Sequence, residues 1–332
     1  MDVIRIKKPP SILSGAAVVG GKEHDGPLGG VFDLHDASGT FGMDTWEKSE
    51  SEMQRLAVNT ALAKAGLSPD GIDVIFAGDL LNQCVGSNYG VLGFRTAYLG
   101  IYGACSTFTE GLLIAALTVG EGYFSKCAVV TSSHFCTAER QFRFPIEYGG
   151  QRPPTSQWTV TGAGAAIMSA DGDGPYITDV LPGIPVDKGI SDMSNMGAAM
   201  APAAIDTFAR YFEKTKTAPD DYDLILTGDL GVQGRGIMCD FMKSAGYDIS
   251  KKHNDCGLLI YGAKSQDTHS GGSGCGCAAS VFSSLILKRL KSGELKNILF
   301  AATGALMSPG SVKQGNSIPG IAHLVHISNK KE

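Results

Sequence analysis

The segment Asp73-Val-Ile-Phe-Ala-Gly-Asp-Leu80 returns almost unchanged as Asp223-Leu-Ile-Leu-Thr-Gly-Asp-Leu230. Each copy is an apolar run that ends in Gly-Asp-Leu, which is typical of a buried strand followed by a turn. An amphipathic helix precedes each copy, over 51–66 and over 203–215, and leaves through a Pro-Asp turn. The repetition indicates that one structural unit occurs twice in the chain.

Three further elements, an apolar helix and two strands, follow in the same order in both parts of the chain. They are expected over 107–120, 126–131 and 161–169 in the first part, and over 278–291, 297–302 and 321–327 in the second. Strands that alternate with helices predict an α/β fold with parallel-rich sheets and right-handed crossovers. We expect two halves, 1–170 and 171–332, which meet at the turn-forming cluster Asp171-Gly-Asp-Gly-Pro175.

The composition is that of a folded protein with a large buried interior. Of its 332 residues, 43% are hydrophobic and only 18% are charged, and its 44 glycines follow no period. These figures exclude a disordered chain and a collagen-like chain. The net charge of −5 leaves no basic surplus, so nucleic acid is not expected as a partner.

The cysteines and the apolar runs indicate the cellular compartment in which the protein is made. Several of the eight cysteines lie in apolar runs, so buried free thiols are expected rather than disulfides. The spacing of Cys275-Gly-Cys277 does not suit zinc, and neither a metal nor a cofactor is expected. Residues 1–13 do not resemble a signal peptide, and the longest apolar run, 111–120, is about half a membrane span. We therefore expect a soluble protein made in the cytoplasm.

Cys105 is the most distinctive single residue. It follows Gly103-Ala104 and directly precedes the predicted helix over 107–120. A thiol at a helix N-terminus is expected to favour its thiolate form, and the adjacent backbone N–H groups could stabilise an oxyanion. The alternative is a small buried thiol at a strand-helix turn.

Two histidines lie where sites often form. His269 precedes a glycine-rich loop, and the duplication places that loop opposite the loop of Cys105. His134 follows a predicted strand, at the end where ligands bind in α/β sheets. The alternatives are a solvated loop residue for His269 and a structural residue for His134.

The segment from Phe135 to Trp158 combines arginines with aromatic residues and prolines. Its arginines are Arg140, Arg143 and Arg152. A guanidinium binds carboxylates through two hydrogen bonds and stacks on rings, so this segment suits a planar anion. A solvated loop that contacts a protein partner is the alternative.

Three motifs together resemble the thiolase and ketoacyl-synthase superfamily. They are, in chain order, Ala104-Cys105-Ser106, the strand from Thr161, and His269 before its glycine-rich loop. The chain resembles the stage V sporulation protein AD family more closely. This resemblance is carried by the segments Thr131 to Pro145, Gly29 to Asp33 and Gly274 to Cys277. The first resemblance implies a layered α-β-α-β-α fold of two sheets and a homodimer, for which the strand 127–131 is a candidate edge. The second implies binding of dipicolinic acid, possibly as its calcium chelate, for uptake into the developing spore. It also implies a peripheral place beside the proteins of a spore inner-membrane transport assembly.

The chain departs from the condensing enzymes, which pair the nucleophile with His/His or His/Asn. The strand expected to end in such a motif ends in Gly228-Asp229-Leu230-Gly231, and only Cys105 and His269 carry over, as vestigial groups. A thiolate without its acid and base condenses poorly, which favours a binding protein over an enzyme. A residual acyltransferase that uses Cys105 and a scaffold with an empty pocket remain as alternatives. The expected ligand-binding residues are Cys105, His134, Arg140, Arg143, Arg152, Asp229 and His269.

Overall fold

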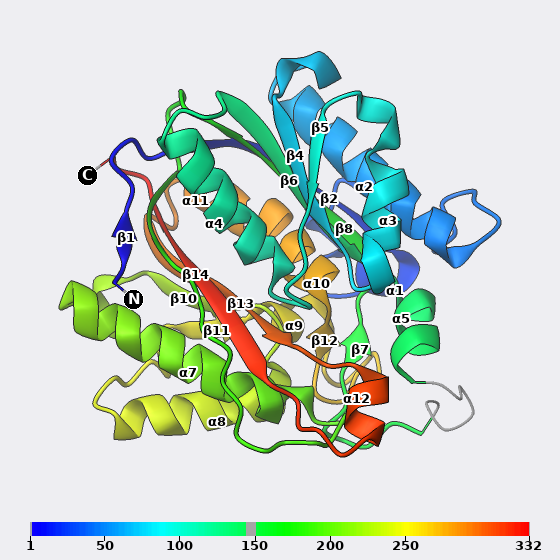
Figure 1. Cartoon of the computed structure of the whole chain (residues 1–332), viewed down its shortest axis with the longest axis vertical. Coiled ribbons are helices and arrows are strands. Elements are labelled where there is room, and N and C mark those ends of the chain that lie inside the picture. The colour runs from blue at the N-terminus through cyan, green and yellow to red at the C-terminus, as the bar shows by residue number, and fades with distance from the viewer. Residues whose placement is uncertain (1, 144–150, 332) are drawn as a thin grey trace.

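The computed structural model describes residues 2–143 and 151–331, and an extended sheet system dominates it (Figure 1). The strands are β1 (Ile4–Arg5), β2 (Ser11–Gly20), β3 (Leu34–Asp36), β4 (Val74–Gly78), β5 (Ala97–Gly100), β6 (Lys126–Ser133), β7 (Trp158–Thr159), β8 (Gly162–Ser169), β9 (Tyr176–Leu181), β10 (Leu224–Thr227), β11 (His253–Asp255), β12 (Gly272–Ser273), β13 (Asn297–Ala305) and β14 (Gly320–Ser328). The short strands β7 and β12 pair only with each other.

Helices cover both sides of these strands. They are α1 (Gly21–His24), α2 (Trp46–Lys64), α3 (Val85–Gly90), α4 (Thr107–Gly120), α5 (Phe135–Phe142), α7 (Met196–Thr215), α8 (Gly231–Ser244), α9 (Cys256–Ile260), α10 (Cys275–Val281), α11 (Leu287–Lys291) and α12 (Pro309–Lys313). A single π-helical turn, Phe282–Ile286, joins α10 to α11, so the helix expected over 278–291 begins three residues earlier and is not uniform.

The two halves have the same strand topology. The order is β5-β4-β6-β8-β2 in the N-terminal half and β11-β10-β13-β14-β9 in the C-terminal half. In each half the first two of these pairings are parallel and the last two are antiparallel. The predicted α/β fold with duplicated halves is therefore confirmed, whereas the boundary at residue 170 stays a prediction.

The two sets of strands enclose a central helical layer. Strand β2 of one set and β9 of the other join edge to edge at the pair Ser11–Tyr176. Helix α4 packs on β6 of its own half and on β13 and β14 of the other half, and α10 packs on β6 and β8. The outer faces are covered by α2 on the N-terminal half and by α7 and α8 on the C-terminal half (Figure 1). These are the five layers α-β-α-β-α.

Each pair of adjacent layers encloses buried apolar side chains. In the middle, Phe282 stacks on Phe300 with ring centroids 5.1 Å apart, and Phe108 of α4 lies 5.6 Å from Phe282. All three rings are fully buried. Burial of such a side chain is worth about 1.5–3 kcal/mol, so these rings stabilise the contact between the halves.

One expectation about the sheet edges is wrong. The strand 127–131 was expected as an edge or interface strand, but β6 pairs with β4 on one side and β8 on the other. Its residues Cys127–Val130 are fully buried, because this apolar run lies in the interior of the sheet. The ends of the strand order are β5 and β11.

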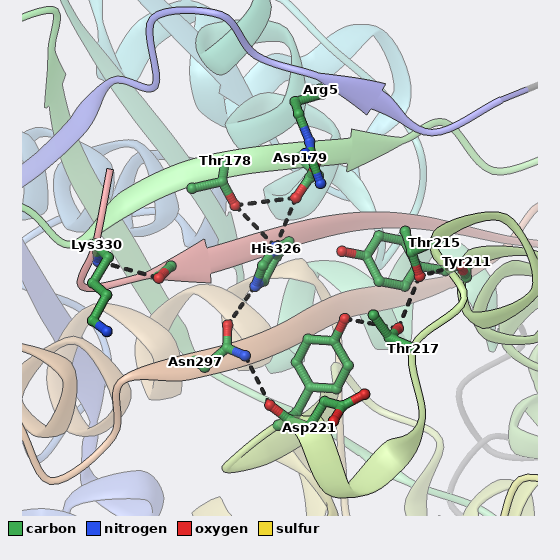
Figure 2. A network of polar contacts seen from close by, with 12 residues as sticks. Arg5, Thr178, Asp179, Tyr211, Thr215, Thr217, Asp221, Asn297, His326 and Lys330 are labelled. Carbon is green, nitrogen blue, oxygen red and sulfur yellow. Dashed lines mark hydrogen bonds and ion pairs between the residues drawn. The ribbon is translucent and has the colours of Figure 1, made fainter. Parts of the chain in front are cut away.

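A polar network ties the N-terminal strand to the C-terminal half (Figure 2). Arg5 of β1 donates to Asp179 of β9, which also faces His326 of β14. The other nitrogen of His326 faces Asn297 at the start of β13. The network thus joins four neighbouring strands, far from the cavity described next.

Candidate functional site

A tight turn holds Cys105 at the N-terminus of α4. Ala104 adopts a left-handed backbone with φ of 52°, and Ser106 is the N-cap residue. Gly304 of β13 approaches this turn so closely that a Cβ there would lie 2.3 Å from the Gly103 carbonyl oxygen. Both halves therefore position Cys105, which is only 5% exposed.

A cavity with about 590 Å³ of empty space, its mouth included, opens in front of Cys105. Most of its wall is apolar or aromatic, as is usual for small-molecule sites. The lining residues are Leu80, Tyr102, Ala104, Cys105, Ala138, Glu139, Phe142, Arg143, Gln157, Thr159, Met193, Ser194, Met196, Ser273, Ala305 and Met307. Among these, Arg143 and Glu139 are the charged residues, and their side chains lie 3.4 Å apart.

A buried carboxylate lies behind Cys105. The thiol is 3.9 Å from the hydroxyl oxygen of Ser273, which donates to Asp229 Oδ2 at 3.0 Å. The backbone N–H of Gly274 donates to the same oxygen at 2.9 Å, and the hydroxyl of Thr303 donates to Oδ1 at 3.0 Å. Cys105, Ser273 and Asp229 therefore form a chain of polar contacts that runs from the cavity wall into the interior.

This environment opposes ionisation of the thiol. Burial, followed by the charge of Asp229 and its hydrogen bond, raises the pKa of Cys105 well above its usual range. The thiolate expected from the helix N-terminus is therefore wrong, because burial and the adjacent carboxylate outweigh the helix dipole. Burial likewise raises the pKa of Asp229 to about 7, with a smaller contribution from Asp255, while the hydrogen bonds that Asp229 accepts lower it.

The three arginines have separate surroundings. Arg143 lines the cavity and donates to the backbone oxygen of Gln157 at 3.1 Å. Arg140 pairs instead with Glu47 of α2, beside a surface hollow outside the cavity. Arg152 donates to Asp267 at 2.7 Å and lies over the Trp158 ring. Only Arg143 of the three lies with Cys105.

The two histidines have local partners. His269 Nδ1 lies 2.9 Å from the carbonyl oxygen of Pro153, and its Nε2 lies 3.1 Å from Asp267. His134 caps α5, accepting from the Cys136 N–H, and its other ring nitrogen contacts the Gly39 oxygen. Burial lowers the pKa of His134. Neither histidine lines the cavity, so the structure does not bring them to Cys105.

Ser273 and Gln157 were missed by sequence reasoning. Gln157 donates its amide hydrogens to the carbonyl oxygens of Asp229 and Gly272, which anchors the segment from 151 onward. Ser273 stands two residues before α10, as Cys105 stands two residues before α4. Comparison of the two halves could have indicated Ser273, whereas no local signal marks Gln157.

Comparisons with known proteins fit this architecture. The family model of stage V sporulation protein AD matches residues 2–328. The chain belongs to this family. It is 45% identical to stage V sporulation protein AD of Bacillus subtilis (strain 168). The match extends over 317 residues and covers 96% of this chain and 94% of that protein.

Solved structures of the thiolase-like superfamily share the fold. A 3-oxoacyl-(acyl-carrier-protein) synthase III from Aquifex aeolicus has a TM-score of 0.58 at 15% identity, with 96% of this chain and 99% of that chain covered. An OleA variant from Xanthomonas campestris has a TM-score of 0.61 at 17% identity, with 98% and 99% covered. Within the described residues of this sporulation family member, no helix has both the length and the apolar character needed to cross a bilayer.

Proposed function

We propose that this sporulation protein binds dipicolinic acid in the Cys105 cavity, for uptake of this ligand into the developing spore. The observation that carries the proposal is the place of Arg143, whose guanidinium lines the same cavity as Cys105. A guanidinium is suited to a planar carboxylate because it can donate two parallel hydrogen bonds. The N-terminal end of α4, beside Cys105, adds positive electrostatic potential.

The aromatic wall supports a planar ligand. Tyr102 and Phe142 line the cavity beside Arg143, together with several methionines. Aromatic rings favour offset stacking or edge contacts with another ring, and methionine adapts its shape to a ligand. A pyridine ring between such side chains, with one carboxylate on Arg143, is the arrangement that we propose.

The surroundings of Cys105 favour binding over acyl transfer. An activated thiol nucleophile has a lowered pKa, whereas burial and Asp229 raise the pKa of Cys105, and no histidine is among the described residues that line its cavity. We further propose that the protein acts as a homodimer, peripherally on the spore inner membrane, beside the other proteins of the transport assembly.

Titration with dipicolinate by calorimetry tests the proposed site. Arg143→Ala is expected to weaken binding at least tenfold, because a charge-assisted bidentate contact is lost. Arg140→Ala is the matched control, since Arg140 lies in α5 three residues before Arg143 and pairs with Glu47 outside the cavity. Equal affinity of Arg143→Ala and the wild type would place the ligand elsewhere.

An acylation assay tests the alternative function, which is acyl transfer by Cys105. The protein is incubated with acyl-CoA, and its intact mass is measured. No adduct is expected on the wild type. An adduct that disappears in Cys105→Ala would establish acyl transfer and contradict a pure binding role. Absence of any dipicolinate binding at millimolar ligand would instead favour a scaffold.

A further inference from the structure

The carboxylate of Asp229 accepts several hydrogen bonds, and the titratable groups around it are thiols and a second carboxyl group. Its oxygens receive hydrogens from Ser273, Gly274 and Thr303, as described above. The titratable groups that face it are the thiol of Cys105 from the turn before α4 and the carboxyl of Asp255 from β11. The thiols of Cys256 and Cys277, from α9 and α10, also feel its charge. Each of these named neighbours is a thiol or a carboxyl group.

A doubly negative ligand would therefore meet one guanidinium among the lining residues and the partial positive charge at the N-terminus of α4. The guanidinium of Arg143 is already offset by Glu139, its neighbour in the cavity wall. Asp229 adds a negative charge one hydroxyl group behind the wall. Charges interact strongly in such a desolvated site, so a dicarboxylate needs a compensating positive charge when it binds.

We infer that the cavity takes up one proton together with its dicarboxylate, and that Asp229 holds this proton. The inference rests on the proposed function, and it adds the form in which the ligand is accepted. Ser273 connects the two, since it lines the cavity and also donates to the carboxylate of Asp229.

The hydroxyl of Ser273 gives the proton a direct effect on the ligand. When Asp229 is ionised, the Ser273 hydrogen points to Oδ2 and is not available to the cavity. When Oδ2 takes a proton from solvent, the new O–H donates to Ser273 Oγ, and the Ser273 hydrogen turns toward the cavity. There it donates to a ligand carboxylate oxygen. One O–H bond forms on Asp229, no other covalent bond changes, and no electron is transferred.

The acidity of Asp229 suits this role at neutral pH. Burial raises its pKa to about 7, so the empty site exchanges this proton with solvent in the physiological range. A bound anion nearby raises the pKa further, because like charges disfavour ionisation. Proton uptake and ligand binding then strengthen each other by the same factor.

Calorimetry in buffers with different ionisation enthalpies measures the proton directly. Dipicolinate is titrated into the full-length protein at pH 6, 7 and 8, with a chelator present to remove free metal ions. Uptake is expected to rise from near zero at pH 6 to about half a proton at pH 7 and nearly one at pH 8. Affinity is expected to fall by up to about tenfold per pH unit above pH 7.

Two variants assign the proton to Asp229. Asp229→Asn is uncharged at every pH, so its binding is expected to be independent of pH and to take up no proton. Ser273→Ala is expected to weaken binding and to reduce the uptake, because the connection to the cavity is lost. Thr303→Val is the matched control, since Thr303 donates to the other oxygen of Asp229 and does not line the cavity. It is expected to retain pH-dependent binding.

The possible failures are distinct. Binding by the wild type without proton uptake at pH 8, or uptake unchanged in Asp229→Asn, would overturn the inference and leave the proposed function standing. Binding that appears only after calcium is added would also overturn it, because the metal would then supply the compensating charge. No binding between pH 6 and pH 8, with or without calcium, would remove the proposed function and the inference together.

Discussion

The Nδ1 atom of His326 lies 2.8 Å from Oδ2 of Asp179, in a part of the interior where both side chains are at most 10% exposed (Figure 2). The pair joins β14 to β9, the last and first strands of the C-terminal half. The amide of Asn297 donates to the Asp221 oxygen, so its own oxygen faces the second nitrogen of His326. The His326 ring thus contacts Asp179 and the Thr178 hydroxyl through one nitrogen and Asn297 through the other.

Removal of one partner of this pair is expected to destabilise the protein strongly. Asp179→Asn should lower the free energy of unfolding by about 3–5 kcal/mol, because a buried partner is left uncompensated. Arg5→Ala is the control, since the Arg5 side chain is 76% exposed and such surface pairs contribute at most about 1 kcal/mol. Urea denaturation measures both, and equal losses would contradict a dominant role for the His326 contact.

The same pair predicts a loss of stability in acid. Burial tends to raise the pKa of Asp179, but the hydrogen bond and charge of His326, followed by those of Arg5, lower it overall. A depressed pKa stabilises the fold above the unfolded value of about 4, and this contribution disappears as pH falls through the folded value. The wild type should lose more stability than Asp179→Asn between pH 5 and pH 2.5, measured by thermal unfolding.

A second buried carboxyl predicts the opposite dependence. Burial, and then the charge of Asp79, raises the pKa of Glu50 to about 8. A raised pKa means that stability is complete below the unfolded value, about 4.5, and is lost as pH rises through about 8. Stability should therefore decrease by a few kcal/mol between pH 5 and pH 8.5.

Substitution assigns this loss to Glu50. Glu50→Gln should remain uncharged and reduce the slope of the profile between pH 5 and pH 8.5, while Asp229, whose pKa is also raised, keeps part of that slope. Glu52→Gln, on the same helix, removes a carboxylate that pairs with Arg55 at the surface, and should keep the wild-type slope. A full wild-type slope in Glu50→Gln would show that Glu50 contributes nothing to it.

The fold could be predicted from sequence because its signals are local. Strand β4, the turn after it and helix α4 are each specified by contiguous apolar residues and turn formers, and the repetition of this order implies a common topology. The site could be predicted only in part. Ser273 lies 168 residues from Cys105, and a single sequence does not show which loops of the two halves meet.

The positions of the arginine side chains could not be predicted from the sequence either. Arg140 lies within α5, but Arg143 follows the helix with φ of −120° and ψ of 43°, outside helical geometry. Helical spacing therefore does not fix the direction of its side chain. His269 has a left-handed backbone with φ of 51°, so its ring direction also depends on a loop that no periodic pattern describes.

The close approach of Gly304 to the Cys105 turn gives a steric prediction. A methyl group at Gly304 would lie 2.3 Å from the Gly103 oxygen and 3.1 Å from the Ser106 nitrogen, both of them backbone atoms. Gly304→Ala should therefore displace the turn, weaken dipicolinate binding and lower stability by about 1–3 kcal/mol. Gly236→Ala, in α8 with open space around it, should be neutral or slightly stabilising. Unchanged binding in Gly304→Ala would mean that the turn does not shape the site.

The raised pKa of Cys105 predicts an unreactive thiol. Only the thiolate is alkylated, and both burial and Asp229 disfavour it. At pH 8, iodoacetamide should modify Cys105 at least tenfold more slowly than the same cysteine in the unfolded chain, as measured by peptide mass spectrometry. Asp229→Asn removes the adjacent charge and should speed the reaction, whereas Thr303→Val keeps that charge and should not. Rapid alkylation of the wild type at Cys105 would restore the activated thiolate and, with it, the case for acyl transfer.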